Sequence, residues 1–559
     1  MDDEDDESTA ALLDETGTSV SLGDSEQNPD APVPVRESSS SFGAHRRYIR
    51  PERDASPASS PLPHVPIDPD ADIMRRNLNL DQQRCFANVI ACLLPNDPDN
   101  LQFSAEFFDE LTEYLDLIEY RPSFHPLLMS KNINPRPFAE DMELSSTVEK
   151  AQLLIDLLLF FTSRFQTYDA RLRIVLVQLA DLFRVSWHWV VQEESALMHM
   201  LKSDVSAAEI SSPRTSKAKK WAKVGAAVAI SSSLFVVTAG LAAPALGAGI
   251  VALGAGSGVG AFIGSTAGTA IVSGLMGATG GGLAGYKMNR RVQDIREFAF
   301  RPVDGADRDR DSMLVTICVT GILDDSVGYD ELWWPMKAFI PSDCYVLEWE
   351  TQVLKDTGNG LRNFAKYQLG TQLAQEALRQ TLMMGVMTAL AWPSAFISAS
   401  YLIDNPWSLA VSRADQAGTL LADALCARAH GLRPVSLIGY SVGARVIYRA
   451  LMEMSTRGFE AQGIVQDAFL LGCPESAKPA KWERMQSVVA GRLVNAYSRS
   501  DLVLKFLFRA ASPTLHVCGL EPVQLDTVEN IDLTAMIDGH HTYVTVMPDL
   551  LDVIQFACC

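Results

Sequence analysis

Positive charge and metal-ligand spacings are both scarce in this chain of 559 residues. Lysine and arginine number 47 against 68 aspartates and glutamates, and the net charge of −21 argues against nucleic acid as a partner. The nine cysteines include no C-x-x-C pair, and no spacing typical of a metal site is present. No cofactor motif occurs either, so we expect neither a metal nor a cofactor.

A secretory signal is also missing from the start of the sequence. No basic segment followed by an apolar run stands there, so we expect no cleaved signal peptide. The scattered cysteines, with no C-x-x-C pair among them, agree with this. We therefore expect the soluble parts to face the reducing cytosol. The sequence ends in Cys558 and Cys559. Such a pair can be lipidated, but no C-a-a-X box is present and two unmodified thiols are the simpler interpretation.

Large apolar side chains are few in residues 1–75, which are acidic at first and then rich in serine, proline and arginine. This composition cannot bury enough surface to offset chain entropy, so it predicts a disordered tail. From 76 to 205, apolar residues recur at spacings of three and four, as in Phe86, Val89, Ile90 and Leu93. This period predicts a helical domain of about five helices, in which we find no candidate chemistry.

Charge is absent altogether from Val224 to Tyr286, within a glycine-rich segment that we delimit as 206–292. The uncharged run is long enough for two bilayer crossings of ~20 residues each, with a turn near Pro244. Basic residues flank both ends, which predicts a membrane hairpin with both ends in the cytosol. The alternative is a hairpin that packs on the protein or lies in the membrane surface, because glycine and alanine contribute little transfer energy.

Strands and helices alternate in the last region, 293–559. After a charged linker, Asp294 to Asp311, apolar runs predict strands at Leu314–Val319, Tyr345–Trp349, Val435–Ile438, Ile464–Leu471, Arg492–Ala496 and Val528–Leu533. Helices are expected at Lys481–Val488 and from about His541 to Phe556. A second uncharged run, Gln380 to Ile403, is most simply a buried crossover helix, the alternatives being a lid or a helix that dips into the membrane. Such alternation predicts an α/β fold with a parallel sheet covered on both faces.

A strand, a sharp turn and a helix follow one another around Ser441. The run Val435–Ile438 ends at Gly439, and an amphipathic helical pattern begins soon after Gly443. Gly439, Ser441 and Gly443 form G-x-S-x-G, the nucleophile elbow, in which a strained serine requires neighbours without side chains. A plain glycine and serine turn before a helix is the alternative, but the flanking strand and helix favour the elbow.

A serine hydroxyl needs a base and an acid that orients the base. In α/β-hydrolases these follow in the order Ser, Asp or Glu, His, each after a strand. Asp501 follows a predicted strand, and His540 precedes the last helix. We therefore predict Ser441 as nucleophile, His540 as general base and Asp501 as orienting acid, with His541 as a second choice of base and Asp467 as a weaker acid. Taken alone, Asp501 is equally typical of a helix N-cap.

Two backbone N–H groups are expected to form an oxyanion hole. One would come from Val442, directly after the nucleophile. The other would come from the loop after the strand Leu314–Val319, most simply from Gly321 or Ile322.

Several long motifs resemble the transmembrane and coiled-coil domain-containing protein four family. They are TICVTGIL, YLIDNPWSLAVSRADQAG, LIGYSVGAR, GRLVNAYSRSDLVLKFLFRA and GHHTY, together with LAAPALGAG and GYKMNRRV. The resemblance covers roughly residues 80 to 556. It implies a membrane protein with an α/β-hydrolase-like domain, largely of unknown function. The family's Gly-His-x-x-Tyr pattern falls on Gly539, His540 and Tyr543, which favours His540 over His541.

Two functions are compatible with these observations. The first is a membrane-associated serine hydrolase that cleaves an ester or thioester. We expect its substrates to be lipids, because the hairpin would place the site near a bilayer. It would be a multi-pass protein of an intracellular membrane, with the hydrolase domain in the cytosol. The second is a non-catalytic scaffold of membrane traffic, in which the hydrolase fold binds rather than cleaves and the N-terminal tail recruits trafficking proteins.

Overall fold

The computed structural model describes residues 73–210, 295–362 and 406–556, apart from short gaps at 131–132, 145, 166, 304–311, 324, 326, 337–341, 502–503, 506–515, 538 and 555. Most of the predicted tail and the predicted hairpin lie outside the described residues, as do the uncharged run 380–403 and the two terminal cysteines. Among the residues that are described, no helix combines the length and the apolarity that a membrane crossing needs.

The first described region is helical, as its period predicts. Its helices are α1 (Ile73–Arg76), α2 (Leu80–Leu93), α3 (Leu101–Tyr114), α4 (Arg121–Met129), α5 (Arg136–Asp141), α6 (Thr147–Phe165), α7 (Ala170–Phe183) and α8 (Trp187–Ile210), with a 3₁₀ turn, η1 (Ile118–Tyr120). These are more than the five expected from the sequence. Helices as short as α1 and α5 contain too few turns to display a period.

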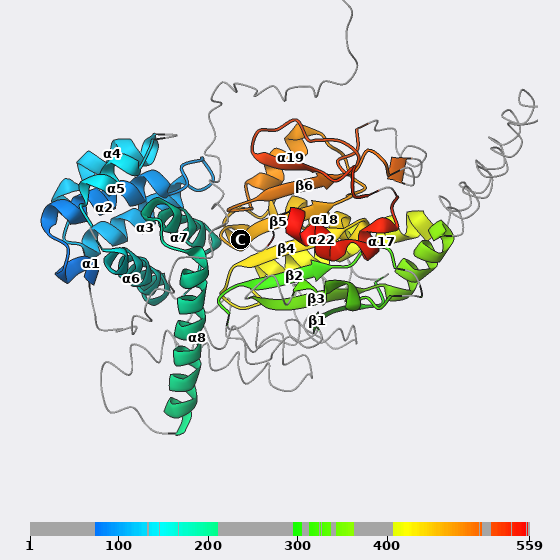
Figure 1. Cartoon of the computed structure of the whole chain (residues 1–559), viewed down its shortest axis with the longest axis horizontal. Coiled ribbons are helices and arrows are strands. Elements are labelled where there is room, and N and C mark those ends of the chain that lie inside the picture. The colour runs from blue at the N-terminus through cyan, green and yellow to red at the C-terminus, as the bar shows by residue number, and fades with distance from the viewer. Residues whose placement is uncertain are drawn as a thin grey trace, which may run out of the picture. The chain divides into compact units, whose positions relative to one another are not determined.

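The second region is built on a seven-stranded sheet in the order β1-β3-β2-β4-β5-β6-β7 (Figure 1). Its strands are β1 (Phe298–Pro302), β2 (Val315–Val319), β3 (Asp343–Trp349), β4 (Val435–Tyr440), β5 (Val465–Leu471), β6 (Leu493–Tyr497) and β7 (Val528–Asp532). All neighbours pair in parallel except β1 and β3. The sheet is therefore mostly parallel, and the chain has the predicted α/β class.

Strand β1 corrects the expectation of a linker from Asp294 to Asp311. It runs antiparallel to β3, with Phe298 opposite Trp349 and Phe300 opposite Leu347. Phe298 and Phe300 are buried, whereas Arg301 and Pro302 are exposed. With only two inward side chains, β1 is too short to stand out from the charged residues around it.

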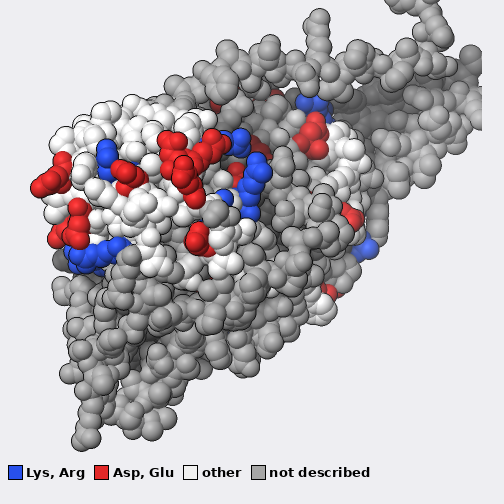
Figure 2. Space-filling model, turned by 60° about the vertical axis from the view of Figure 1, so that its left-hand side comes forward, with Lys and Arg blue, Asp and Glu red and all other residues white. Residues whose placement is uncertain are grey.

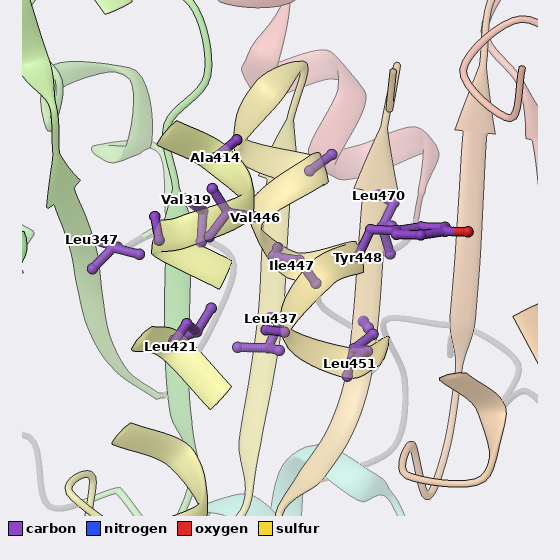
Figure 3. Packing of buried hydrophobic residues seen from close by; sticks show 14 of the residues in the cluster. Val319, Leu347, Ala414, Leu421, Leu437, Val446, Ile447, Tyr448, Leu451 and Leu470 are labelled. Atoms are coloured by element: carbon purple, nitrogen blue, oxygen red, sulfur yellow. The ribbon is translucent and has the colours of Figure 1, made fainter. Parts of the chain in front are cut away.

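The two faces of the sheet carry different apolar clusters because side chains alternate along each strand. Ile317 and Val319 belong to the first cluster, which α17 (Ser408–Cys426), α18 (Val442–Met454) and α19 (Pro479–Gln486) help to form. Cys318 belongs to the second, together with residues of η2 (Glu331–Trp333) and α22 (Met547–Val553). Figure 3 shows α18 lying over the strands of the first face. The central strands are thus covered on both faces.

The predicted C-terminal helix from His541 to Phe556 is divided in two. The short helix α21 (Thr542–Thr545) ends at Val546, and α22 begins at Met547 with Pro548 in its first turn. Proline has no N–H and fits best in the first turn of a helix, which agrees with a new helix beginning there. On the surface, Figure 2 shows acidic and basic groups interspersed on one face of the described part.

Candidate active site

The turn between β4 and α18 holds Ser441 in a strained conformation. Its φ is 56° and its ψ −132°, a region that residues with a side chain rarely adopt. A Cβ at position 443 would lie 2.3 Å from the carbonyl oxygen of Val319, and one at 439 would lie 2.9 Å from the carbonyl carbon of Gly443. Only glycine fits at both positions, so the close contact of α18 with the strand ends depends on them.

The side chains of Ser441, His540 and Asp501 form one chain of hydrogen bonds. Ser441 Oγ lies 2.6 Å from His540 Nε2, and His540 Nδ1 lies 2.6 Å from Asp501 Oδ2. All three residues are buried, with 0%, 4% and 0% of their surfaces exposed. Because Nδ1 faces a carboxylate, the imidazole proton belongs there and Nε2 is left to accept the serine proton.

Asp501 serves the imidazole and the backbone at the same time. While Oδ2 faces His540, its Oδ1 accepts a hydrogen bond from the backbone N–H of Leu504 at 2.9 Å. The contact expected of an orienting acid and a hydrogen bond of the kind made by an N-cap, which are alternatives in the sequence, are thus made by the two oxygens of one carboxylate. Nearby, Ser498 Oγ donates to the carbonyl of Ile537 at 2.8 Å, which ties the end of β6 to the loop that carries His540.

The two reserve candidates lie elsewhere. Asp467 is buried inside β5, where Oδ1 accepts the Arg492 N–H at 2.6 Å and Oδ2 accepts a bond from Gln466. Burial raises the pKa of Asp467 despite these bonds. It precedes Leu471, whose carbonyl accepts the Ser441 N–H, by four residues, or ~13 Å of strand. His541 is exposed at the N-cap of α21.

The loop after β2 lies directly against Ser441. A Cβ at Gly321 would be 2.2 Å from the Tyr440 carbonyl oxygen and 2.8 Å from Ser441 Cβ. Val442 is the first residue of α18, where backbone N–H groups have no partner within the helix. The structure therefore brings Gly321 close to Ser441, which Val442 follows in the chain, and Ile322 comes next in the same loop as Gly321.

Aromatic side chains that the sequence analysis did not assign surround this site. Tyr440 donates to the Ile322 carbonyl at 2.7 Å, and Trp349 Nε1 donates to the Thr320 carbonyl at 3.0 Å. The ring of Tyr543 packs edge-on against His540, with centroids 5.8 Å apart. Two signals are present in the sequence: Tyr440 directly precedes Ser441, and Tyr543 ends the Gly-His-x-x-Tyr pattern. Trp349 has no such signal, because a contact between distant strands leaves no local pattern.

Tyr543 is fully buried, and its burial affects the pKa of its hydroxyl group. Its hydroxyl has no hydrogen-bond partner among the described residues, and a Cβ at Gly472 would lie 2.6 Å from it. Burial first, and the charge of Asp501 second, raise the pKa of Tyr543 well above its ordinary value. Tyr543 thus stays neutral and supports the imidazole through ring contact. Within the described ranges, no group of three or more His, Cys, Asp or Glu residues is placed to hold a metal ion.

Taken together, the described part is an α/β protein with a serine, a histidine and an aspartate hydrogen-bonded to one another beside a strand-to-helix turn. The chain belongs to the family described as Protein of unknown function (DUF726), whose model matches residues 216–557. This match includes all three residues. The expected resemblance holds at the level of this family.

Three relatives illustrate the similarity. A transmembrane and coiled-coil domain-containing protein of Oryza sativa subsp. japonica is 34% identical over 70% of this chain and 62% of its own length. An uncharacterized membrane protein of Caenorhabditis elegans is 31% identical over 82% of this chain and 76% of its own. A probable lipase of Saccharomyces cerevisiae is 34% identical over 54% of this chain and 28% of its own. No solved structure matches this chain.

Proposed function

We propose that this protein is a serine hydrolase of the α/β-hydrolase fold, in which Ser441, His540 and Asp501 act as a catalytic triad. The hydrogen-bond chain from Ser441 Oγ through His540 to Asp501 is the observation that carries the proposal. The positive φ of Ser441 supports it, because a strained serine between strand and helix is the geometry of a nucleophile elbow.

The geometry supports an acyl transfer in two steps. Ser441 Oγ attacks the carbonyl carbon of an ester or thioester while His540 Nε2 takes its proton. The bond to the leaving alcohol or thiol breaks as His540 returns the proton to it, and the acyl group stays on Ser441. Water, deprotonated by His540, then attacks the acyl carbon. His540 returns this proton to Ser441 Oγ as the bond between the acyl group and Ser441 breaks and the carboxylic acid leaves. Asp501 holds the imidazole and stabilises its positive charge throughout.

The developing negative charge on the carbonyl oxygen would meet two backbone donors. Val442 N–H stands at the N-terminus of α18, a helix of 13 residues whose dipole favours an anion there. The loop after β2 would supply the second donor, Gly321 or Ile322. The contact of Gly321 with Ser441 Cβ favours Gly321.

Lipid esters are the substrate class we propose. The name of the yeast relative, a probable lipase, supports it, and the names of the rice and worm relatives support a membrane location. The uncharged segment between 206 and 292 would form the membrane hairpin. The chain would then be a multi-pass protein of an intracellular membrane, with the hydrolase domain in the cytosol. Within its family, we propose that it belongs with the transmembrane and coiled-coil domain-containing protein four group.

Labelling with a fluorescent fluorophosphonate tests the proposal on the full-length protein in its membrane. We expect wild-type labelling that is lost in Ser441→Ala and in His540→Ala, while thermal unfolding shows that both variants are folded. A folded wild type that takes no label contradicts the triad and favours the scaffold. If labelling succeeds, release of fatty acid from phospholipid and acylglycerol vesicles tests the lipid class.

A further inference from the structure

The loop after β2 is fastened to the residue that precedes the nucleophile. Tyr440 is fully buried, and its hydroxyl donates to the carbonyl of Ile322 at 2.7 Å across 118 residues of sequence. Its ring stacks on Tyr543, with centroids 6.3 Å apart, and lies at the same centroid distance from Trp333. One side chain therefore links the nucleophile strand, the loop and the ring that supports His540.

The beginning of the loop is fastened as well. Trp349 Nε1 donates to the Thr320 carbonyl at 3.0 Å, and Trp333 Nε1 donates to Thr320 Oγ1 at 2.8 Å. In a trans peptide the N–H points away from the carbonyl of the same unit. Holding the Thr320 carbonyl therefore sets the direction of the Gly321 N–H. Holding the Ile322 carbonyl sets the plane of the Ile322–Leu323 unit, so the loop is fixed on both sides of the Gly321–Ile322 unit.

We infer that Tyr440 is a positioning residue for the oxyanion hole: its hydroxyl holds the Thr320–Leu323 loop at a fixed distance and orientation from Ser441. This inference rests on the proposed hydrolase function. An oxyanion donor acts only when it lies within hydrogen-bond range of the oxygen that becomes charged, so a shift of about 1 Å in the loop is enough to weaken it. Tyr440 touches no reacting atom and acts through the loop.

Tyrosine-to-phenylalanine variants separate this role from packing. Tyr440→Phe removes a hydroxyl that makes a hydrogen bond, whereas Tyr448→Phe removes a buried hydroxyl without a partner among the described residues. Tyr448 lies on α18, two turns beyond Ser441, and serves as the matched control. Hydrolysis of a p-nitrophenyl ester by the full-length protein gives kcat and KM for each variant.

We expect Tyr440→Phe to lower kcat by about 10- to 100-fold with KM within threefold of wild type, because the hole acts in the transition state. Tyr448→Phe should keep both constants within threefold. The pH dependence of kcat/KM should keep its midpoint in Tyr440→Phe, since the bonds of His540 are untouched. Trp349→Phe, which releases the other end of the loop, should lower kcat in the same way.

Three results would overturn the inference, and they are distinguishable from one another. If the wild type is active and Tyr440→Phe keeps its kcat, the loop needs no such fastening, and the proposed hydrolase function stands. If the folded wild type neither takes the fluorophosphonate nor cleaves the ester, the hydrolase function fails and the role of Tyr440 fails with it. If Tyr448→Phe lowered kcat as much as Tyr440→Phe does, the loss would come from altered packing and not from the missing hydrogen bond.

Discussion

Ser441 Oγ and His540 Nε2 lie 2.6 Å apart although 99 residues separate them in the chain. The two groups come from different loops, one after β4 and one after β7, and both are buried. Such a contact exists only in the folded sheet. Substitutions at these and neighbouring residues can therefore be tested twice, once for their effect on the rate of ester hydrolysis and once for their effect on the free energy of unfolding.

Replacing Ser441 should reveal the strain stored at the elbow. At φ 56° an alanine keeps the strain, whereas glycine relieves it. We expect Ser441→Gly to be more stable than Ser441→Ala by about 1 kcal/mol, with both inactive. Urea unfolding of the two proteins measures the difference, and a more stable alanine variant would contradict a strained nucleophile.

Two substitutions of Asp501 separate its contact with His540 from its hydrogen bond with the Leu504 backbone N–H. Asparagine can still accept the Leu504 N–H but favours the wrong imidazole tautomer, so Asp501→Asn should remain folded and lose about 10⁴-fold in kcat. Asp501→Ala should also lose the cap, at an extra cost of about 1 kcal/mol. Ester hydrolysis and chemical unfolding measure the two effects. Equal stabilities of the two variants would exclude the capping role.

The elbow glycines should tolerate no side chain. Gly443→Ala places a methyl group against the Val319 carbonyl, and we expect a loss of about 3 kcal/mol. Gly458 is the control: its φ is positive, at 58°, whereas Gly443 lies in helix α18, and a Cβ at Gly458 would meet nothing within 4 Å. Gly458→Ala should cost only about 1 kcal/mol. Comparable losses of thermal stability in the two variants would argue against the tight contact.

Stability should fall in mild acid because of His430. Its imidazole is fully buried, and burial, followed by the charges of Arg428 and Arg433, lowers its pKa well below 6.5. The unfolded chain binds a proton near pH 6.5 and the folded one does not, so stability is complete above that pH and decreases below it. The slope from this group approaches about 1.4 kcal/mol per pH unit. Unfolding between pH 7.5 and 5 should be less pH-dependent in His430→Gln.

Local patterns were enough to predict the elements that carry the site. The predicted run Leu314–Val319 is strand β2, and the run Arg492–Ala496 overlaps β6, because buried strands are continuous apolar segments. The motif around Ser441 was readable since its strand, turn and helix are contiguous. The order of Asp501 and His540 after it then left few alternatives.

Long-range contacts could not be predicted in the same way. Nothing near Tyr440 indicates that its hydroxyl reaches Ile322, and nothing near Asp501 decides between a cap and an orienting acid. Strand β1 was missed because its pairing with β3 comes from across the sheet rather than from its own five residues. These features depend on which segments the fold brings together.

Strand β1 also determines how the sheet ends. Without it, β3 would offer a free row of backbone groups to any other extended chain. The outer strands instead carry residues that discourage such pairing: Arg301 and Pro302 on β1, and Glu529 and Asp532 on β7. Parallel sheets pair slowly because their contacts are far apart in sequence, so such residues on the outer strands would limit aggregation while the sheet forms.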